Sequence, residues 1–159
     1  MAALQWRLDA FHRPYHAALA EALASARAAC GHAILLDLHS MPPIPAGQPG
    51  HGARIVIGDH FGAAAADWVV DLVMNAAGTL QQPVSRNQPY AGGHVIRTHG
   101  LPLRGIHAVQ IELDRGLYLG PDRSPDRALV ADLAHWFADL VRAAGRARPA
   151  PDIIIQAAE

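Results

Sequence analysis

Apolar residues recur at helical spacing in three long segments of the chain. They fall every three or four positions in residues 9–30, 61–77 and 124–145, which predicts three helices that each pack on one side. Pro14 predicts that the regular part of the first helix begins near Arg13, because proline is favoured in a first helical turn.

Glycine and capping residues mark the ends of these helices. Gly31, Gly78 and Gly145 each follow or close an apolar stripe, as residues at helix ends often do. Ser124 is a suitable N-cap for the last helix, and Pro125 suits its first helical position.

Short apolar runs between the helices predict strands. The clearest run is continuous rather than alternating, which is typical of a strand covered on both faces in an α/β sheet. The main candidates are Ala33–His39, Arg54–Ile57 and His107–Leu113, and shorter ones are His94–Arg97 and Ile153–Ile155. Residues 81–93 are expected to form a loop around their prolines and glycines.

This order of elements predicts an α/β fold. We expect a single domain over residues 1–159, with a mixed or parallel sheet flanked by helices. In such sheets ligands gather at the carboxyl ends of the strands. Asp37–Ser40 and Glu112–Arg115 both lie near predicted strand ends, so they are the main candidates for catalytic or ligand-binding residues.

Composition excludes several classes of function. The net charge is −1, with 13 basic and 14 acidic residues, so nothing indicates binding to nucleic acid. No apolar run approaches the roughly 20 residues of a membrane-spanning helix. Residues 1–9 lack the basic start and apolar stretch of a signal peptide, so we expect a cytoplasmic protein. Cys30 is the only cysteine, so a metal site would need histidines and carboxylates.

His39 stands out among the 10 histidines by its setting. It ends a predicted buried strand and precedes a loop rich in proline and glycine, which would hold a metal ligand rigidly at a cleft. Asp37, two positions earlier, could accept a hydrogen bond from the imidazole. The more common explanation for such a histidine is a hydrogen bond to loop backbone.

Glu112 lies in or at the end of another predicted buried strand. Burying a carboxylate is costly unless it is paired or has a task. Beside a metal-bound water it would serve as a general base, since burial raises a carboxyl pKa toward neutrality. An ion pair with Arg115 explains it equally well.

Arg97 and Asn87 are candidates for binding a substrate. A guanidinium in a cleft suits bidentate binding of a carboxylate, although a solvated surface arginine is the more common case. Asn87 opens a turn-rich stretch whose backbone could approach a ligand closely, or which could be an ordinary loop. The chain has none of the HExxH, P-loop or GxSxG motifs.

Five segments, taken in order, resemble the N-formylglutamate amidohydrolase family. They are Arg13–His16, which is similar to its PYH helix start; Leu36–Pro42, similar to DxHSMP; Gly58–Gly62, similar to GDxxG; Asn87–Gly93, similar to NxPYAGG; and Gln110–Tyr118, similar to QIExxRxLY. Any one of these would be weak evidence, whereas the ordered set is specific.

The resemblance implies a metal-dependent hydrolase with a zinc carboxypeptidase-like fold. It implies cleavage of the N-acyl amide of an acidic amino acid, as in histidine degradation, by a zinc-activated water. By similarity His39 is a zinc ligand, Glu112 is the general base that later protonates the leaving amine, and Arg97 and Asn87 contact the substrate.

One departure from the family leaves alternatives open. Family members begin with a further segment that supplies the first histidine and a carboxylate ligand, whereas a catalytic zinc usually has three protein ligands. The chain is therefore expected to be truncated at its N-terminus, or to be a non-catalytic metal- or amino-acid-binding remnant.

Two further expectations follow from that departure. A substitute metal site could be built from other histidines, such as His51, His60, His94 and His99, although their spacing offers no specific pair. A missing segment would also leave a sheet edge or core face exposed, so we expect self-association.

Overall fold

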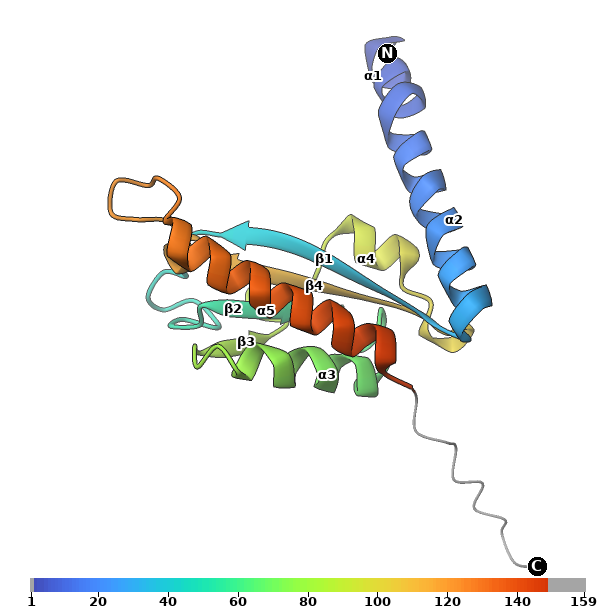
Figure 1. Ribbon diagram of the computed structural model, residues 1–159. Helices are drawn as coiled ribbons and strands as arrows, with labels where there is room; N and C mark the ends of the chain where they lie inside the picture. Colours follow the sequence, from blue (N-terminus) through green and yellow to red (C-terminus); the bar gives the residue numbers. More distant parts are fainter. Residues whose placement is uncertain (1, 149–159) are drawn as a thin grey trace, which may run out of the picture.

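A computed structural model describes residues 2–148 as a four-stranded mixed sheet with helices on both faces (Figure 1). The strand order is β1-β4-β2-β3, with β1 at Ala33–Met41, β2 at Ile55–Gly58, β3 at Val84–Arg86 and β4 at Ile106–Asp114. Strands β1 and β4 are parallel, as are β2 and β3, whereas β2 and β4 are antiparallel. The predicted α/β class and flanked mixed sheet are confirmed.

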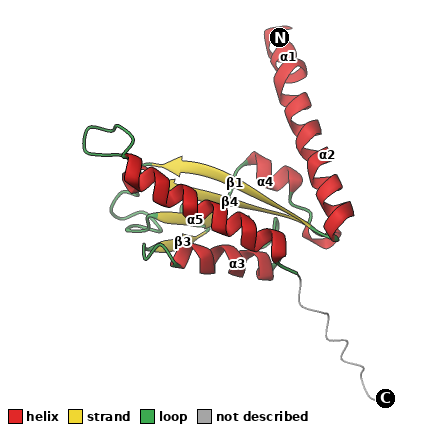
Figure 2. Cartoon of the chain, in the orientation of Figure 1, coloured by secondary structure: helices red, strands yellow, loops and turns green. Residues whose placement is uncertain are grey.

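The helices divide between the two faces of the sheet. Helices α3 and α5 cover one face, and the short helix α4 lies on the other (Figures 1 and 2). The helical segments are α1 at Ala2–Arg7, η1 at Leu8–His12, α2 at Arg13–Cys30, α3 at Asp67–Gly78, α4 at His94–His99, η2 at Pro102–Arg104, η3 at Arg115–Leu117 and α5 at Arg127–Arg146. Among the described residues, no helix combines the length and apolar character needed to cross a membrane.

The main core fills the space between the sheet and helices α3 and α5. Alternate residues of the strands face these helices, because successive strand side chains point to opposite faces. The buried members include Ile55, Ile57, Val70, Val109, Ile111 and Leu140. This packing fixes which residues of β1 and β4 face the other way.

The first helical segment is longer than predicted. Pro14 predicted a start near Arg13, but residues 2–12 are also helical, with a π-helical turn at Leu8–His12. The π-helical turn lies just before Pro14, whose ring lacks a backbone donor and would crowd the preceding turn of a regular α-helix. Gly31 ends the helix in the left-handed conformation at φ 82°, as predicted.

The segment His94–Arg97 was predicted to be a strand and is a helix. It forms most of α4, where Ile96 is buried against Ala108 of β4. A run this short carries no periodicity that separates one buried strand from one helical turn. The second predicted helix is also shorter, since His60 and Phe61 adopt positive φ and α3 begins only at Asp67.

Smaller differences concern β3 and the start of α5. The stretch 81–93 was predicted to be a loop, but Val84–Arg86 pairs with β2. Helix α5 is capped by Asp126, whose carboxylate accepts hydrogen bonds from the Ala128 and Leu129 amides, rather than by Ser124. The predicted strand Ile153–Ile155 lies outside the described residues.

Strand β1 lies at one edge of the described sheet, which limits how far it is covered. The sequence predicted cover on both faces, yet the Leu38 side chain is 46% exposed. An edge strand has a neighbour on one side only, so its side chains and its outer backbone groups are less protected. Self-association through this edge stays a prediction.

Truncating the core centre should destabilise the chain strongly. Ile111→Ala removes a fully buried side chain and should lower the free energy of unfolding by about 2–5 kcal/mol. Urea denaturation measures the change. Leu103→Ala, a truncation of a fully exposed side chain, should stay within about 0.5 kcal/mol of the parent, and equal effects of the two changes would contradict this description of the core.

Candidate active site

The polar residues of β1 and β4 meet on the sheet face opposite α3 and α5. The parallel register pairs Asp37 with Gln110 and His39 with Glu112. Because strand side chains alternate, these four residues share one face, while Leu38 and Ile111 between them point to the side of α3 and α5. The register thus brings two sequence-predicted candidates, His39 and Glu112, into adjacent positions.

His39 is held by Asp37 on the same strand. Its Nε2 lies 3.0 Å from the Asp37 Oδ1, and the side chain is 46% exposed. The nearby negative charge favours a proton on Nε2, and in the neutral ring Nδ1 then keeps its lone pair. Nδ1 of His39 is therefore free to bind an ion or a ligand.

Glu112 is buried and is tied to the loop before α4 through Gln110. The Gln110 Nε2 donates to the Glu112 Oε1 at 2.9 Å, and the Gln110 Oε1 accepts from the Gly93 amide at 2.7 Å. The loop can lie this low because Gly58 has no side chain: a Cβ there would approach the Ala91 backbone to 2.7 Å. Two hydrogen bonds, both made by the Gln110 side chain, thus connect the loop to the Glu112 carboxylate.

The surroundings of Glu112 raise its pKa. Burial is the main cause, and the nearby Asp37 carboxylate acts in the same direction. His39, the hydrogen bond from Gln110 and Arg115 oppose the shift without cancelling it. A carboxyl group with a raised pKa can exchange a proton nearer to neutral pH, which is what general acid–base chemistry needs.

Asn87 belongs to a separate buried cluster around Asp59. The Asn87 Oδ1 accepts from the Asp59 amide at 3.0 Å, and its Nδ2 donates to the Asp59 carboxylate. Arg86 donates to the same carboxylate at 2.7 Å. Burial acts to raise the pKa of Asp59, but the hydrogen bonds from Arg86 and Asn87 outweigh it and hold the pKa below its ordinary value.

Asp59 and Arg86 were not singled out by the sequence reasoning. The signal was present, since Asp59 directly follows β2 and Arg86 ends β3. These strands are parallel neighbours, so their carboxyl ends meet at one edge. The pairing was hidden because β3 was not predicted.

Arg97 is exposed on α4, the helix on the polar face of the sheet. Within residues 2–148 its guanidinium makes no hydrogen bond or ion pair with another side chain. Its neighbour Ile96 anchors the helix on β4 through Ala108. Arg97 thus remains available to an anionic ligand on the same side of the sheet as Glu112.

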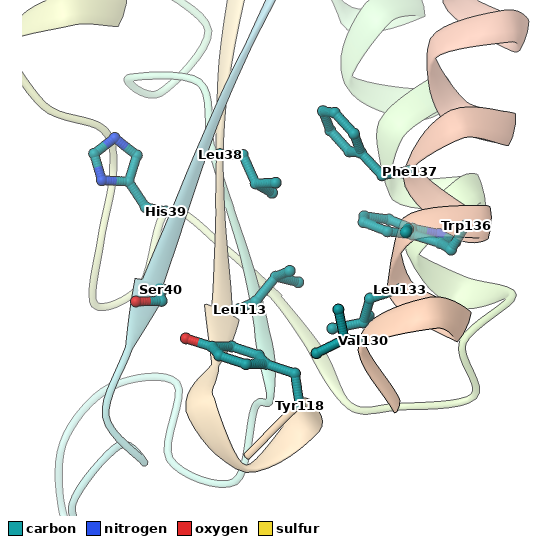
Figure 3. A pocket seen from close by; sticks show the side chains of 10 residues that line it. Leu38, His39, Ser40, Leu113, Tyr118, Val130, Leu133, Trp136 and Phe137 are labelled. Atoms are coloured by element: carbon teal, nitrogen blue, oxygen red, sulfur yellow. The ribbon is translucent and has the colours of Figure 1, made fainter. Parts of the chain in front are cut away.

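A pocket of about 510 Å³ lies on the other side of β1, between that strand and α5. Leu38, Leu113 and Phe137 point into it, whereas the His39 ring projects from the opposite side of the strand (Figure 3). Its lining is mainly apolar, with Tyr118 at one end. His39 and Ser40 also border the pocket, but the pocket opens on the side of β1 opposite to the His39 ring.

The histidines considered for a substitute metal site do not all meet. His94 and His99 both approach His16 of α2. His51 instead contacts the Ile44 carbonyl oxygen at 3.0 Å, and His60 lies beside Phe61.

Comparison with known proteins decides the family. The profile of the N-formylglutamate amidohydrolase family matches residues 1–119. The chain belongs to this family. The resemblance seen in the five sequence segments is thereby confirmed.

Curated relatives and a solved structure support the same family assignment. The chain is 33% identical over 132 residues to an N-formylglutamate deformylase of Pseudomonas aeruginosa, covering 81% of this chain and 48% of the relative. It is 33% identical over 115 residues to the Pseudomonas putida deformylase, covering 70% and 43%. A crystal structure of N-formylglutamate amidohydrolase from Ralstonia eutropha matches with a TM-score of 0.73 and 33% identity, over 91% of this chain and 52% of that one.

A gene product from Agrobacterium tumefaciens shares the fold, with a TM-score of 0.60 at 24% identity over 87% of this chain and 50% of that one. The chain thus spans about half the length of the proteins it matches.

Removing the Asn87 side-chain amide should destabilise the fold, because buried Asp59 then loses two of its hydrogen bonds. Asn87→Gly suits the positive φ of 60° at this position, so the change mainly removes the side-chain hydrogen bonds. We expect a loss of about 1–3 kcal/mol in the free energy of unfolding by urea denaturation. Asn75→Ala on the exposed side of α3 is the control, and a loss no larger than in that variant would contradict the assignment.

The raised pKa of Glu112 should make its effect on stability depend on pH. Between the unfolded-state pKa of about 4.3 and the higher pKa in the fold, the folded chain binds more protons. The free energy of unfolding of the parent therefore falls as pH rises through this window. The Glu112→Gln variant lacks this loss because glutamine does not titrate.

The stability difference between Glu112→Gln and the parent should thus increase from about pH 4 to about pH 7. Urea denaturation in chelator-containing buffer measures it, with Glu21→Gln on the exposed surface of α2 as control. A difference that is flat or that falls with pH would refute the raised pKa.

Proposed function

We propose that this chain carries part of the active site of an amidohydrolase that cleaves the N-acyl amide of an acidic amino acid, of the N-formylglutamate class. The names of its relatives give the reaction. The observation that carries the proposal is the pairing of a buried Glu112 with an Asp37-held His39 across neighbouring strands.

A zinc ion in this site would find one ligand position in the described chain. The free Nδ1 of His39, with Nε2 held by Asp37, suits a zinc-bound imidazole. Within residues 2–148 no set of three ligating groups includes His39, so these residues do not complete a catalytic zinc site. We propose that the remaining ligands come from residues outside this chain. A zinc ion bound there would polarise the acyl carbonyl and lower the pKa of a water molecule.

Glu112 is proposed to move the proton. Its raised pKa lets the carboxylate accept a proton from the attacking water and return it to the leaving amine. The hydrogen bond from Gln110 fixes one carboxylate oxygen, which orients the other. The substrate must therefore approach over the polar face of β1 and β4.

Arg97 and Asn87 are proposed to act on the substrate in different ways. The guanidinium of Arg97, which has no side-chain partner among residues 2–148, suits a substrate carboxylate, and it lies on the helix that covers the polar face. The Asn87 amide is already engaged with Asp59, so its contribution would be to hold the turn before Ala91–Gly93. Contact of Asn87 with the substrate would need exchange of these bonds.

A second candidate function is binding without catalysis. The described residues supply a single zinc ligand beside Glu112, which favours a metal- or amino-acid-binding relative that does not turn over substrate. In the first function Glu112 transfers a proton during hydrolysis, whereas in the second function no reaction takes place.

A chimaera separates the two. In it, this chain replaces the matching half of the Pseudomonas aeruginosa deformylase, and formate release from N-formylglutamate is measured. We expect hydrolysis that Glu112→Gln lowers by about 10²–10⁴-fold, the usual contribution of a general acid–base residue.

Glu21→Gln in the same chimaera is the matched control and should leave the rate unchanged. Circular dichroism and zinc content establish that each chimaera is folded and loaded. A folded, zinc-loaded chimaera without activity would favour the binding function, and full activity in Glu112→Gln would remove Glu112 from the mechanism.

A further inference from the structure

Four imidazoles gather where the start of helix α2 passes helix α4. His12 ends the π-helical turn, His16 lies in the first turn of α2, and His94 and His99 begin and end α4. The ring centroids of His12 and His16 are 4.4 Å apart, and those of His16 and His94 are 5.1 Å apart. One ring nitrogen from each of His12, His16 and His94 lies within 4.8 Å of the others.

The backbone arrangement favours convergence of these rings. His12 and His16 are four residues apart on one continuous helical path, a spacing that places two side chains on the same face. His94 comes from a different element and approaches both, with its ring 5.6 Å from that of His12. The site therefore joins two helices that are far apart in sequence.

The nitrogen positions are close to those of a tetrahedral metal site. Nitrogens bound to zinc at about 2.0–2.1 Å lie roughly 3.4 Å from one another. His12 and His94 are exposed, so rotation of their side chains can shorten these distances. For His94, the rotation would break the 3.3 Å contact between its Nε2 and the Thr98 hydroxyl.

His16 is presented in the form that binds a metal. Its Nδ1 lies 2.7 Å from the Nε2 of buried His99, which leaves the His16 Nε2 as the nitrogen open to an ion. A neutral imidazole with an open nitrogen is the species that ligates a metal ion.

We propose that His12, His16 and His94 bind a divalent late first-row transition-metal ion, with Zn²⁺ the best fit. Three imidazoles and no carboxylate select such ions over Mg²⁺ and Ca²⁺, which prefer oxygen ligands. Three protein ligands leave a fourth position for water or an anion. None of these residues belongs to the proposed amidohydrolase site, so the two sites can be tested separately.

The bound ion would fasten α2 to α4. An ion that binds the folded chain and not the unfolded chain raises the melting temperature. The helical arm of residues 2–30 extends beyond the sheet (Figure 1), so a second attachment to α4 would restrict its motion.

The test is titration of the metal-stripped chain with Zn²⁺ by calorimetry, together with thermal unfolding with and without the ion. His12→Gln and His94→Gln change exposed side chains on two different elements, so the fold should survive, as circular dichroism can verify. His135→Gln on the exposed surface of α5 is the matched control, and His39→Ala removes the ligand of the proposed active site.

We expect one equivalent of Zn²⁺ whose affinity falls at least tenfold in both His12→Gln and His94→Gln, with loss of the ion-induced rise in melting temperature. His135→Gln and His39→Ala should keep that equivalent. Co²⁺ at the same site should give visible absorption that disappears in His94→Gln.

Unchanged binding in His12→Gln and His94→Gln, or absence of binding to the parent, would overturn the proposal. Loss of the only bound ion in His39→Ala alone would also overturn it while supporting the zinc ligand of the proposed function. Two equivalents, one lost with His94→Gln and the other with His39→Ala, would support both sites.

Discussion

The parallel pairing of β1 with β4 is the constraint on which the rest of the structure depends. Its register places His39 opposite Glu112, and a shift by one residue would turn every side chain of β1 to the other face. The apolar residues on the core side, such as Leu36 opposite Val109, resist that shift because they would lose their packing against α3 and α5. Hydrophobic packing on one face of the sheet thus aligns the polar chemistry on the other.

Burying carboxylates on the polar side of the sheet costs free energy of folding, which the hydrophobic core offsets. A buried carboxylate at Glu112 is costly, and its partners leave its pKa raised rather than lowered. Asp59 is buried more completely, yet Arg86 and Asn87 compensate it. The two acids on neighbouring strands therefore have opposite characters: Asp59 is a structural anion, and Glu112 is a group able to exchange protons.

The sequence predicted the elements whose signals are local and missed those that depend on tertiary contacts. The strand that contains His39 was found from its continuous apolar run, and the strand that contains Glu112 from Val109 and Ile111 at its centre. Strand β3 was missed because Val84–Arg86 is short and is a strand only by pairing with β2. Helix α4 was mistaken for a strand because a run as short as His94–Arg97 carries no periodicity that separates a strand from a helical turn.

The same limit applies to the candidate site. The positions of His39 and Glu112 at predicted strand ends singled them out, and the strand register then placed them side by side. The ion pair of Asp59 with Arg86 could not be derived without β3. The spacing of His94 and His99 offered no pair, because their partners His12 and His16 lie far away in sequence, with 83 positions between His16 and His99.

The two groups of histidines owe their geometry to different forces, and this separates their chemistry. His39 is set by a strand register and by the Asp37 carboxylate, so its orientation follows from the sheet. The rings of His12, His16 and His94 are brought together by two helical segments, and His12 and His94 are exposed. An imidazole positioned by the sheet beside a buried acid suits a reaction that needs fixed distances. Exposed imidazoles beside the partly buried His16 suit capture of an ion, since the ion itself can complete their alignment.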